Sequence, residues 1–285
     1  MKRSRSLGLS RTLAANATAR MCIALAVATA VTAVAWGQQR LGFNAQRGAP
    51  QVRNVRYDGR FTFARIRFET APGGYYYRGL PAWAHGYGFG IEGDDEVAGR
   101  NLMRILKEIT YVQPRTQESE VFALDDSAVM MYPVAYMAEP DYWVMNDREA
   151  AGLRTYLKKG GFLIFDDFRD DFRNGNQGWA NFESNMRRVL PDAQFVDLDP
   201  SAPIFHSFYD IDSFGIIPQY YDQGAPILRG VYEDNDPAKR LLMVINFNTD
   251  VSNFWEYSAN GFMPVALSNE AYKLGVNYVM YGMTH

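Results

Sequence analysis

Hydrophobic and polar residues follow regular periods along most of the chain, and these periods predict both strands and helices. Residues 60–70 alternate, with Ile66 and Phe68 on one face and arginines on the other, which predicts a strand buried on one side only. Short apolar runs predict four more strands, at residues 121–124, 128–137, 162–165 and 194–198. Two further runs, 225–232 and 241–247, flank a charged turn and predict a hairpin.

Other segments repeat apolar residues at helical spacing and predict four helices, over residues 94–110, 146–159, 179–190 and 268–283. We expect Asp94 or Asp95 to begin the first helix and Ser268 to begin the last. Asn146 and Glu149 have the spacing of a capping box at the start of the second. Because strands alternate with helices, the chain is expected to form an α/β fold with helices on both faces of a mostly parallel sheet.

The N-terminal segment, residues 1–37, has the layout of a secretory signal peptide. Five basic residues precede or enter an apolar run that ends in small residues, and Ala33 with Ala35 gives a cleavage pattern before Trp36. The apolar run is shorter than the ~20 residues that a spanning helix needs, but an uncleaved membrane anchor is the alternative. We therefore expect an exported protein, periplasmic or anchored facing the periplasm, with a flexible linker over residues 38–58 and one domain over 59–285.

The cysteine content and the net charge exclude some kinds of chemistry and disfavour some partners. Cys22 is the only cysteine, so cleavage of residues 1–37 leaves no disulfide, no thiolate nucleophile and no cysteine ligand for a metal. The same cleavage takes the net charge from −3 to −8, which disfavours nucleic acid and anionic lipid as partners. The expected partners are an envelope protein or glycan, and the membrane only through an uncleaved N-terminal segment.

Candidate reactive residues gather where strands are expected to end. Asp166 and Asp167 directly follow the strand predicted over residues 162–165, and ligands of α/β sheets bind outside the carboxyl ends of strands. Both aspartates are candidate ligands of a divalent metal, the one cofactor that the pattern allows. His85 and His206 lie in loops and are candidates to join them in acid and base catalysis. The alternative is that an aspartate caps a turn and that each histidine is held by backbone groups.

Two other segments offer binding residues. The loop over residues 71–93 is rich in glycine and aromatic residues, and Tyr76, Trp83 and Tyr87 are candidates to stack on sugar rings. Alternatively, these rings cover the edge of the sheet. Asn246, Asn248 and Asp250 follow the apolar residues 241–245 and are candidates to line the same crevice, or else they form a polar turn.

Several segments together resemble the DUF4159 family, a domain of unknown function in the class I glutamine amidotransferase-like superfamily. The resemblance rests on the sequences at residues 83–110, 132–168, 203–211 and 269–285. It implies a flavodoxin-like doubly wound sheet and little about activity. Amidotransferases of that superfamily use a cysteine paired with histidine and glutamate, so the absence of cysteine after Cys22 excludes glutaminase chemistry here.

We therefore expect an exported, non-enzymatic domain that acts as a binding or assembly module at the cell envelope. No cysteine nucleophile, G-x-S-x-G elbow or phosphate-binding loop is present in residues 38–285. The alternative is a hydrolase of envelope glycan or peptide, with Asp166 or Asp167 as base or metal ligand and His85 and His206 assisting.

Overall fold

The computed structural model describes residues 50, 52–76, 79–87, 96–117, 119–214 and 224–285. Contacts divide the chain into two units, and the unit made of residues 48–76 and 80–285 holds every described helix and strand. The expected signal segment, residues 38–49 of the expected linker, and Asp94 and Asp95 all lie outside the described residues.

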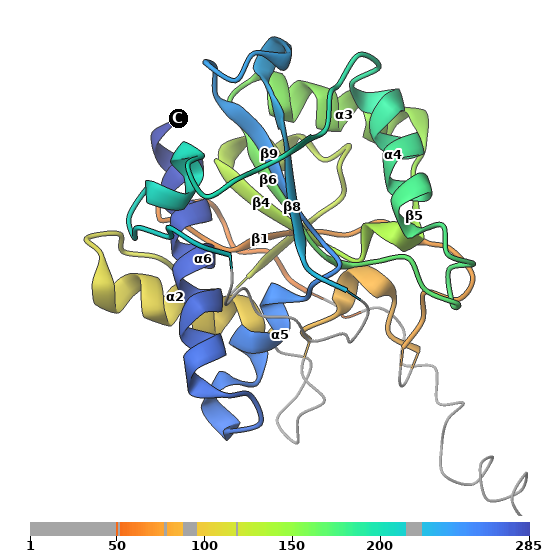
Figure 1. Ribbon diagram of the computed structural model, residues 1–285. Helices are drawn as coiled ribbons and strands as arrows, with labels where there is room; N and C mark the ends of the chain where they lie inside the picture. Colours follow the sequence, from red (N-terminus) through yellow and green to blue (C-terminus); the bar gives the residue numbers. More distant parts are fainter. Residues whose placement is uncertain (1–49, 51, 77–78, 88–95, 118, 215–223) are drawn as a thin grey trace, which may run out of the picture. The chain divides into compact units, whose positions relative to one another are not determined.

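A seven-stranded sheet in the order β3-β1-β4-β6-β9-β8-β7 forms the centre of this unit (Figure 1). The first five strands in that order are parallel, and β8 and β7 are antiparallel at one edge. The strands are β1 (Ala64–Ile66), β3 (Glu120–Phe122), β4 (Val134–Ala138), β6 (Phe162–Phe168), β7 (Val196–Asp197), β8 (Ile227–Tyr232) and β9 (Leu241–Phe247). A separate antiparallel pair joins β2 (Glu69–Thr70) to β5 (Trp143–Val144).

Helices cover both faces of the sheet, as expected from the alternation of strands and helices. On one face lie α3 (Asp147–Lys158) and α4 (Gly178–Val189), and on the other α2 (Ala98–Ile109), α5 (Val251–Glu256) and α6 (Val265–Thr284). Short 3-10 turns connect them, at η2 (Ala82–Ala84), η3 (Ser127–Met131), η4 (Pro140–Tyr142), η5 (Pro203–His206), η6 (Glu233–Asn235) and η7 (Ser258–Asn260). The α/β fold is therefore confirmed.

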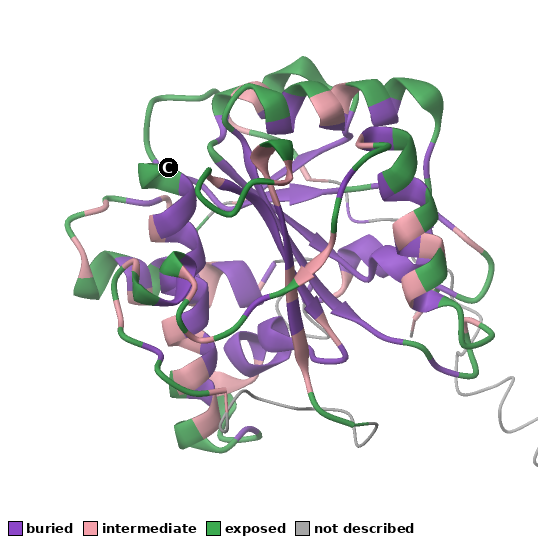
Figure 2. Cartoon of the chain, turned by 45° about the horizontal axis from the view of Figure 1, so that its top comes forward, coloured by how far each residue is buried: buried purple, intermediate pink, exposed green. Residues whose placement is uncertain are grey.

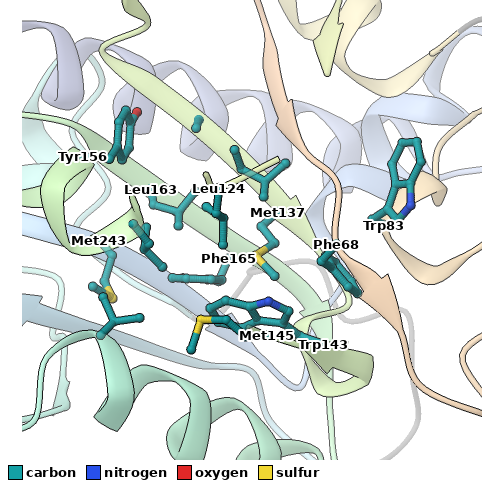
Figure 3. Packing of buried hydrophobic residues seen from close by; sticks show 14 of the residues in the cluster. Phe68, Trp83, Leu124, Met137, Trp143, Met145, Tyr156, Leu163, Phe165 and Met243 are labelled. Carbon is teal, nitrogen blue, oxygen red and sulfur yellow. The ribbon is translucent and has the colours of Figure 1, made fainter. Parts of the chain in front are cut away.

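Strand β6 shows why the middle of the sheet is apolar on both sides. Leu163 and Phe165 pack in the cluster beneath α3 and α4, whereas Phe162 and Ile164 pack in the cluster beneath α2 and α6. Figure 2 shows the central strands buried between the two helical layers, and Figure 3 shows Leu163 and Phe165 among the residues of the first cluster. The expectation of a fully buried strand after Gly161 is confirmed.

The signals predicted for the start and the end of the second helix are confirmed in α3. The Asn146 side chain accepts from the backbone N–H of Glu149 at 3.0 Å, and Glu149 Oε2 accepts from the backbone N–H of Asn146 at 3.0 Å. Gly160 follows the end of α3 with φ of 106°, a conformation that only glycine adopts without strain. The hairpin predicted over residues 225–247 is present as β8 and β9.

Several predicted boundaries of strands and helices were wrong. The strand expected over residues 60–70 divides into β1 and β2, and its Arg65 is fully buried because the sheet is covered on both faces. The run at 128–137 divides into η3 and β4, on either side of Pro133, which has no N–H to donate to a ladder. Helix α6 begins at Val265, ahead of the expected cap Ser268, with Pro264 as its N-cap residue.

Part of the expected linker packs on the sheet. Asn54 exchanges two hydrogen bonds with the backbone of Val121 in β3, at 2.8 and 2.9 Å, and the N–H of Val55 is bonded to the Glu120 carboxylate. Within the described ranges, no helix has the length and hydropathy that crossing a bilayer requires.

Candidate metal centre

The carboxyl ends of three adjacent strands share an unusual backbone conformation. Glu139 follows β4, Asp167 lies near the end of β6 and Asn248 follows β9, with φ of 49°, 61° and 59°. Left-handed conformations cost non-glycine residues about 1–3 kcal/mol and persist where surrounding contacts fix them. Here the Glu139 N–H donates to the carbonyl of Asp166 at 3.0 Å, and the Asn248 N–H to that of Phe168 at 2.8 Å. Three polar residues at the carboxyl ends of the parallel strands therefore have the same left-handed backbone conformation.

The carboxyl ends of the parallel strands include a switch point, at which successive connections pass to opposite faces of the sheet. After β1 the chain continues to α2 on one face and then to β3, whereas after β4 it continues to α3 on the other face and then to β6. Ligands of open α/β sheets bind outside the strand ends at such a switch point. His85, which follows η2 in the connection after β1, and Glu139, which follows β4, come from its two sides.

His85 is surrounded by carboxylates. Its Nδ1 contacts Oδ2 of Asp167 and lies 3.1 Å from Oε1 of Glu139. One ligand atom each from His85, Asp167 and Asp250 all lie within 4.8 Å of one another. The His85 side chain is 18% exposed, whereas those of Asp167 and Asp250 are buried. An imidazole and two carboxylates at this spacing are a donor set that suits a divalent cation.

Asp250 has an oxygen available for a ligand. It is the N-cap residue of α5, and its Oδ1 accepts from the N–H of Asn253 at 2.8 Å and the hydroxyl of Ser252 at 3.0 Å. Its Oδ2 is buried and has no hydrogen-bond partner among the residues that the structure describes. Buried oxygens are rarely left in this state, so this atom marks the position of a missing interaction.

Burial and mutual repulsion perturb these groups. Burial, followed by the nearby charge of Asp167, raises the pKa of Asp250 to about 8. Burial also raises the pKa of Glu139, with His85 acting in the opposite direction. For His85, burial lowers the pKa, but Asp167 and Glu139 outweigh it and the net shift is well upward. The centre therefore holds more carboxyl groups than its single imidazole can pair with, and two of them have raised pKa values.

Asp166, expected as a metal ligand, has a structural role instead. Its Oδ1 accepts from Asn246 Nδ2 at 3.0 Å and from the N–H of Val251 at 3.3 Å, and its Oδ2 from the Tyr136 hydroxyl at 3.0 Å and the N–H of Ser252 at 2.9 Å. Asp166 thus accepts backbone N–H groups as a capping residue does, but at the distant helix α5 and not at the next turn, as the alternative had it. Asp166 and Asp167 contact different partners because adjacent side chains of a strand point to different sides.

Of the three candidates at the end of β9 and just beyond it, only Asp250 joins the centre. The Asn246 side chain is bonded to Asp166 and to the Tyr278 hydroxyl at 3.0 Å, so it links β9 to β6 and α6. The Asn248 side chain donates to the carbonyl of Ala225 at 3.0 Å. Both amides hold the fold together at the strand end.

His206 does not join His85. Its Nδ1 lies 3.0 Å from Asp210 Oδ1 and its Nε2 lies 2.8 Å from the carbonyl of Pro200. Both ring nitrogens are engaged by groups within six residues, as in the backbone-held alternative for a loop histidine. The expected pairing of the two histidines is wrong.

The aromatic loop contributes one ring to the centre. Tyr76 stacks on His85, with ring centroids 5.5 Å apart and planes 17° from parallel. Trp83 and Tyr87 are only 5% and 3% exposed, and Trp83 belongs to the core cluster drawn in Figure 3. These two rings are therefore unavailable to stack on an external sugar, because they pack against each other edge to face at 6.0 Å in the core.

Sequence reasoning missed Glu139 and Asp141. Both follow β4, and the rule that selected Asp166 at the end of β6 would have selected them had it been applied to that strand. Asp141 Oδ2 accepts from Asn174 at 2.8 Å, and its Oδ1 is buried with no partner in the described part of the chain. Burial, opposed by Asn174 and then reinforced by Asp167, raises the pKa of Asp141 to about 7.

Comparison with known proteins gives a family. No curated protein matches the sequence. A family model described as a domain of unknown function, DUF4159, matches residues 87–283, which cover most of the sheet and all of the described α-helices. The chain therefore belongs to the DUF4159 family.

Proposed function

We propose that this protein binds a divalent cation through His85, Asp167 and Asp250, in an exported domain of the cell envelope. The observation that carries the proposal is the convergence of three ligand atoms within 4.8 Å, one of which belongs to a carboxylate with a buried, unpartnered oxygen. Glu139, 3.1 Å from His85 Nδ1, is the nearest further donor.

The burial of the centre favours an ion over a larger ligand. Asp167 and Asp250 are 1% and 0% exposed, so a sugar or peptide cannot reach their oxygens directly. A cation needs only the space between the donor atoms, and its charge offsets the repulsion among the buried carboxylates. The mixed nitrogen and oxygen donors favour Zn²⁺ or Mn²⁺ over Ca²⁺, which takes oxygen ligands.

The test uses protein purified without a histidine tag, one portion analysed as purified and a second portion dialysed against a chelator before ions are added back. We expect about one Zn²⁺ or Mn²⁺ per chain by elemental analysis, and a higher melting temperature when either ion is added. Asp250→Asn should weaken cation binding by at least about 100-fold, since even residues behind the ligands contribute 10- to 100-fold. The amide can keep the capping Oδ1 and replaces only the unpartnered oxygen, so α5 should remain capped.

Asp170→Asn is the matched control. Asp170 Oδ1 also accepts a backbone N–H at the start of a helix, from Trp179 at 2.9 Å, but it is no member of the cluster. His85→Gln and His206→Gln form a second pair, of which only the first should lose the ion. Wild-type protein without bound cation, or Asp250→Asn that binds as tightly as wild type, would refute the metal centre.

Metal-assisted hydrolysis of envelope glycan or peptide is the second candidate. The partly exposed imidazole beside a proposed cation at the strand ends favours it over a purely non-enzymatic binding or assembly module. Zn²⁺-loaded or Mn²⁺-loaded protein should release soluble fragments from purified peptidoglycan, and Asp250→Asn should not. A bound cation without any such release would favour the binding module.

We also propose the finer fold class that the family resemblance implies. Numbered along the chain, the parallel strands occur in the order 2-1-3-4-5, which is the flavodoxin-like order. We extend this to the glutamine amidotransferase-like superfamily, with the cation centre in place of its cysteine. A solved structure whose parallel strands follow another order would contradict the assignment.

A further inference from the structure

The rim of the proposed centre carries positive charge in an otherwise acidic chain. Asp171 Oδ2 is paired with two arginines, Arg169 at 3.1 Å and Arg173 at 3.0 Å. Arg173 therefore shares its carboxylate partner with a second arginine, in a chain whose net charge is −3.

Arg173 is held in a fixed orientation with part of its guanidinium open. Its Nε bonds to Asp171, and its Cζ lies 5.7 Å from the centre of the Tyr76 ring. No described residue forms a hydrogen bond with its two terminal nitrogens, and the side chain is 35% exposed. A guanidinium fixed through Nε presents the remaining N–H groups as a fork that fits carboxylate or phosphate oxygens.

A second donor lies beside it. The Tyr142 hydroxyl is buried and has no hydrogen-bond partner within the described residues. Burial, together with Asp141, raises the pKa of Tyr142 to about 12, and Arg173 acts in the opposite direction. Gly73 lets the two segments meet, because a Cβ there would lie 3.4 Å from the Arg173 carbonyl and 3.7 Å from the Tyr142 ring.

Tyr76 connects these donors to the cation centre. The same ring stacks on His85 and lies under the Arg173 guanidinium. An anion bound by Arg173 would therefore lie on the side of Tyr76 opposite His85, near the ligand Asp167, which repels it until a cation offsets its charge. The geometry predicts that cation and anion bind together.

We propose, resting on the cation centre above, that the ligand of this site carries an anionic carboxylate or phosphate group, which Arg173 and Tyr142 bind beside the cation. This names the class of substrate or partner: an acidic glycan, peptide or phosphate ester. Neutral sugars lack the group that these two donors recognise.

The test measures binding of methyl phosphate and of acetate to Mn²⁺-loaded protein, by calorimetry at constant ionic strength. We expect saturable binding of at least one anion, and the stronger of the two identifies the group. Arg173→Gln should weaken it by about tenfold or more while Mn²⁺ affinity is unchanged, because the charge-assisted hydrogen bonds of the guanidinium are lost. Tyr142→Phe should also weaken it.

Arg187→Gln is the matched control, since Arg187 likewise pairs with a carboxylate, Glu183 at 2.8 Å, and stacks on a ring, Phe195 at 5.3 Å. It should bind the anion as wild type does. If Mn²⁺ binds but neither anion does, or if Arg173→Gln keeps wild-type anion affinity, the anion site is refuted and the cation centre stands. If neither Mn²⁺ nor Zn²⁺ binds, the cation centre is refuted, and the anion site with it.

Discussion

At the scale of single residues, Asp166 is a buried carboxylate whose two oxygens both accept hydrogen bonds from the protein. Four donors surround it, the Tyr136 hydroxyl, the Asn246 amide and the N–H groups of Val251 and Ser252, and each oxygen faces two of them. A carboxylate can accept at both oxygens, whereas an amide has one acceptor and one donor end.

Asp166→Asn should therefore destabilise the protein although it preserves shape and removes a buried charge. Either orientation of the amide sets its NH₂ group against two donors, and each unsatisfied buried group costs about 1–3 kcal/mol, so we expect a loss of about 2–4 kcal/mol. Denaturant unfolding measures it.

The exposed cap Asp170 is again the comparison, since Asn and Asp cap helices about equally and Asp170→Asn should change stability by less than about 0.5 kcal/mol. Equal effects of the two substitutions would show that Asp166 is not the capping residue described above.

At the scale of elements, the short helix α5 depends on its neighbours. A helix of six residues, Val251–Glu256, is too short to persist alone in water. Asp166 and Asp250 cap its start, and the indole N–H of Trp255 donates to the Ala271 carbonyl of α6 at 2.9 Å. Helix α5 fixes the position of Asp250, so its packing bears directly on the cation centre.

Gly275 of α6 allows this packing. A Cβ at that position would lie 2.6 Å from Trp255 Cζ2 and 2.9 Å from Leu102 Cδ1, closer than real contacts permit. Gly275→Ala should therefore lower stability by about 1–3 kcal/mol, although alanine at an exposed helix position would raise it by about 1 kcal/mol. Thermal or denaturant unfolding decides the sign.

Asn269→Ala, at an exposed position of the same helix, provides the reference and should stay within about 0.5 kcal/mol of wild type. A gain in stability for Gly275→Ala would mean that Trp255 and Leu102 move aside at little cost.

At the scale of the whole molecule, export is the property that the N-terminal sequence predicts. Ala35 belongs to two cleavage patterns, Ala33-x-Ala35 before Trp36 and Ala35-x-Gly37 before Gln38. In a bacterial host, the full chain should appear in the periplasm, and its intact mass should correspond to a start at one of these two residues.

Ala35→Phe should block both cleavages and leave the chain attached to the membrane, whereas Ala30→Phe, within the apolar run, should leave processing unchanged. Full-length wild-type chain in the membrane fraction would instead indicate an uncleaved anchor, and wild-type chain in the cytoplasm would contradict export.

Most of the fold could be predicted, because the relevant signals are local. The capping box at Asn146, the left-handed Gly160 and the buried strand that begins at Phe162 depend on residues a few positions apart. The errors arose where distant contacts prevailed. Arg65 is polar in the sequence, yet it is buried because Glu96 pairs with it at 3.0 Å and the carbonyls of Trp83 and His85 accept its N–H groups.

The candidate site could be predicted in part. His85, Asp167 and Asp250 were each selected as polar residues in a loop or at a strand end, but so were His206, Asp166 and Asn246, which have other roles. Residue type and approximate position cannot separate these two groups. The difference lies in which partners each side chain meets, and those partners come from other elements.

The sequence by itself determined the order of strands and helices, the family and the presence of an N-terminal segment with the features of an export signal, since each rests on period or short-range pattern. Only the tertiary structure decided that Asp167 meets His85, 82 residues earlier in the chain, while the adjacent Asp166 caps α5. The physical reason is the order of strands in the sheet, which brings the ends of β4, β6 and β9 together and turns neighbouring side chains in different directions.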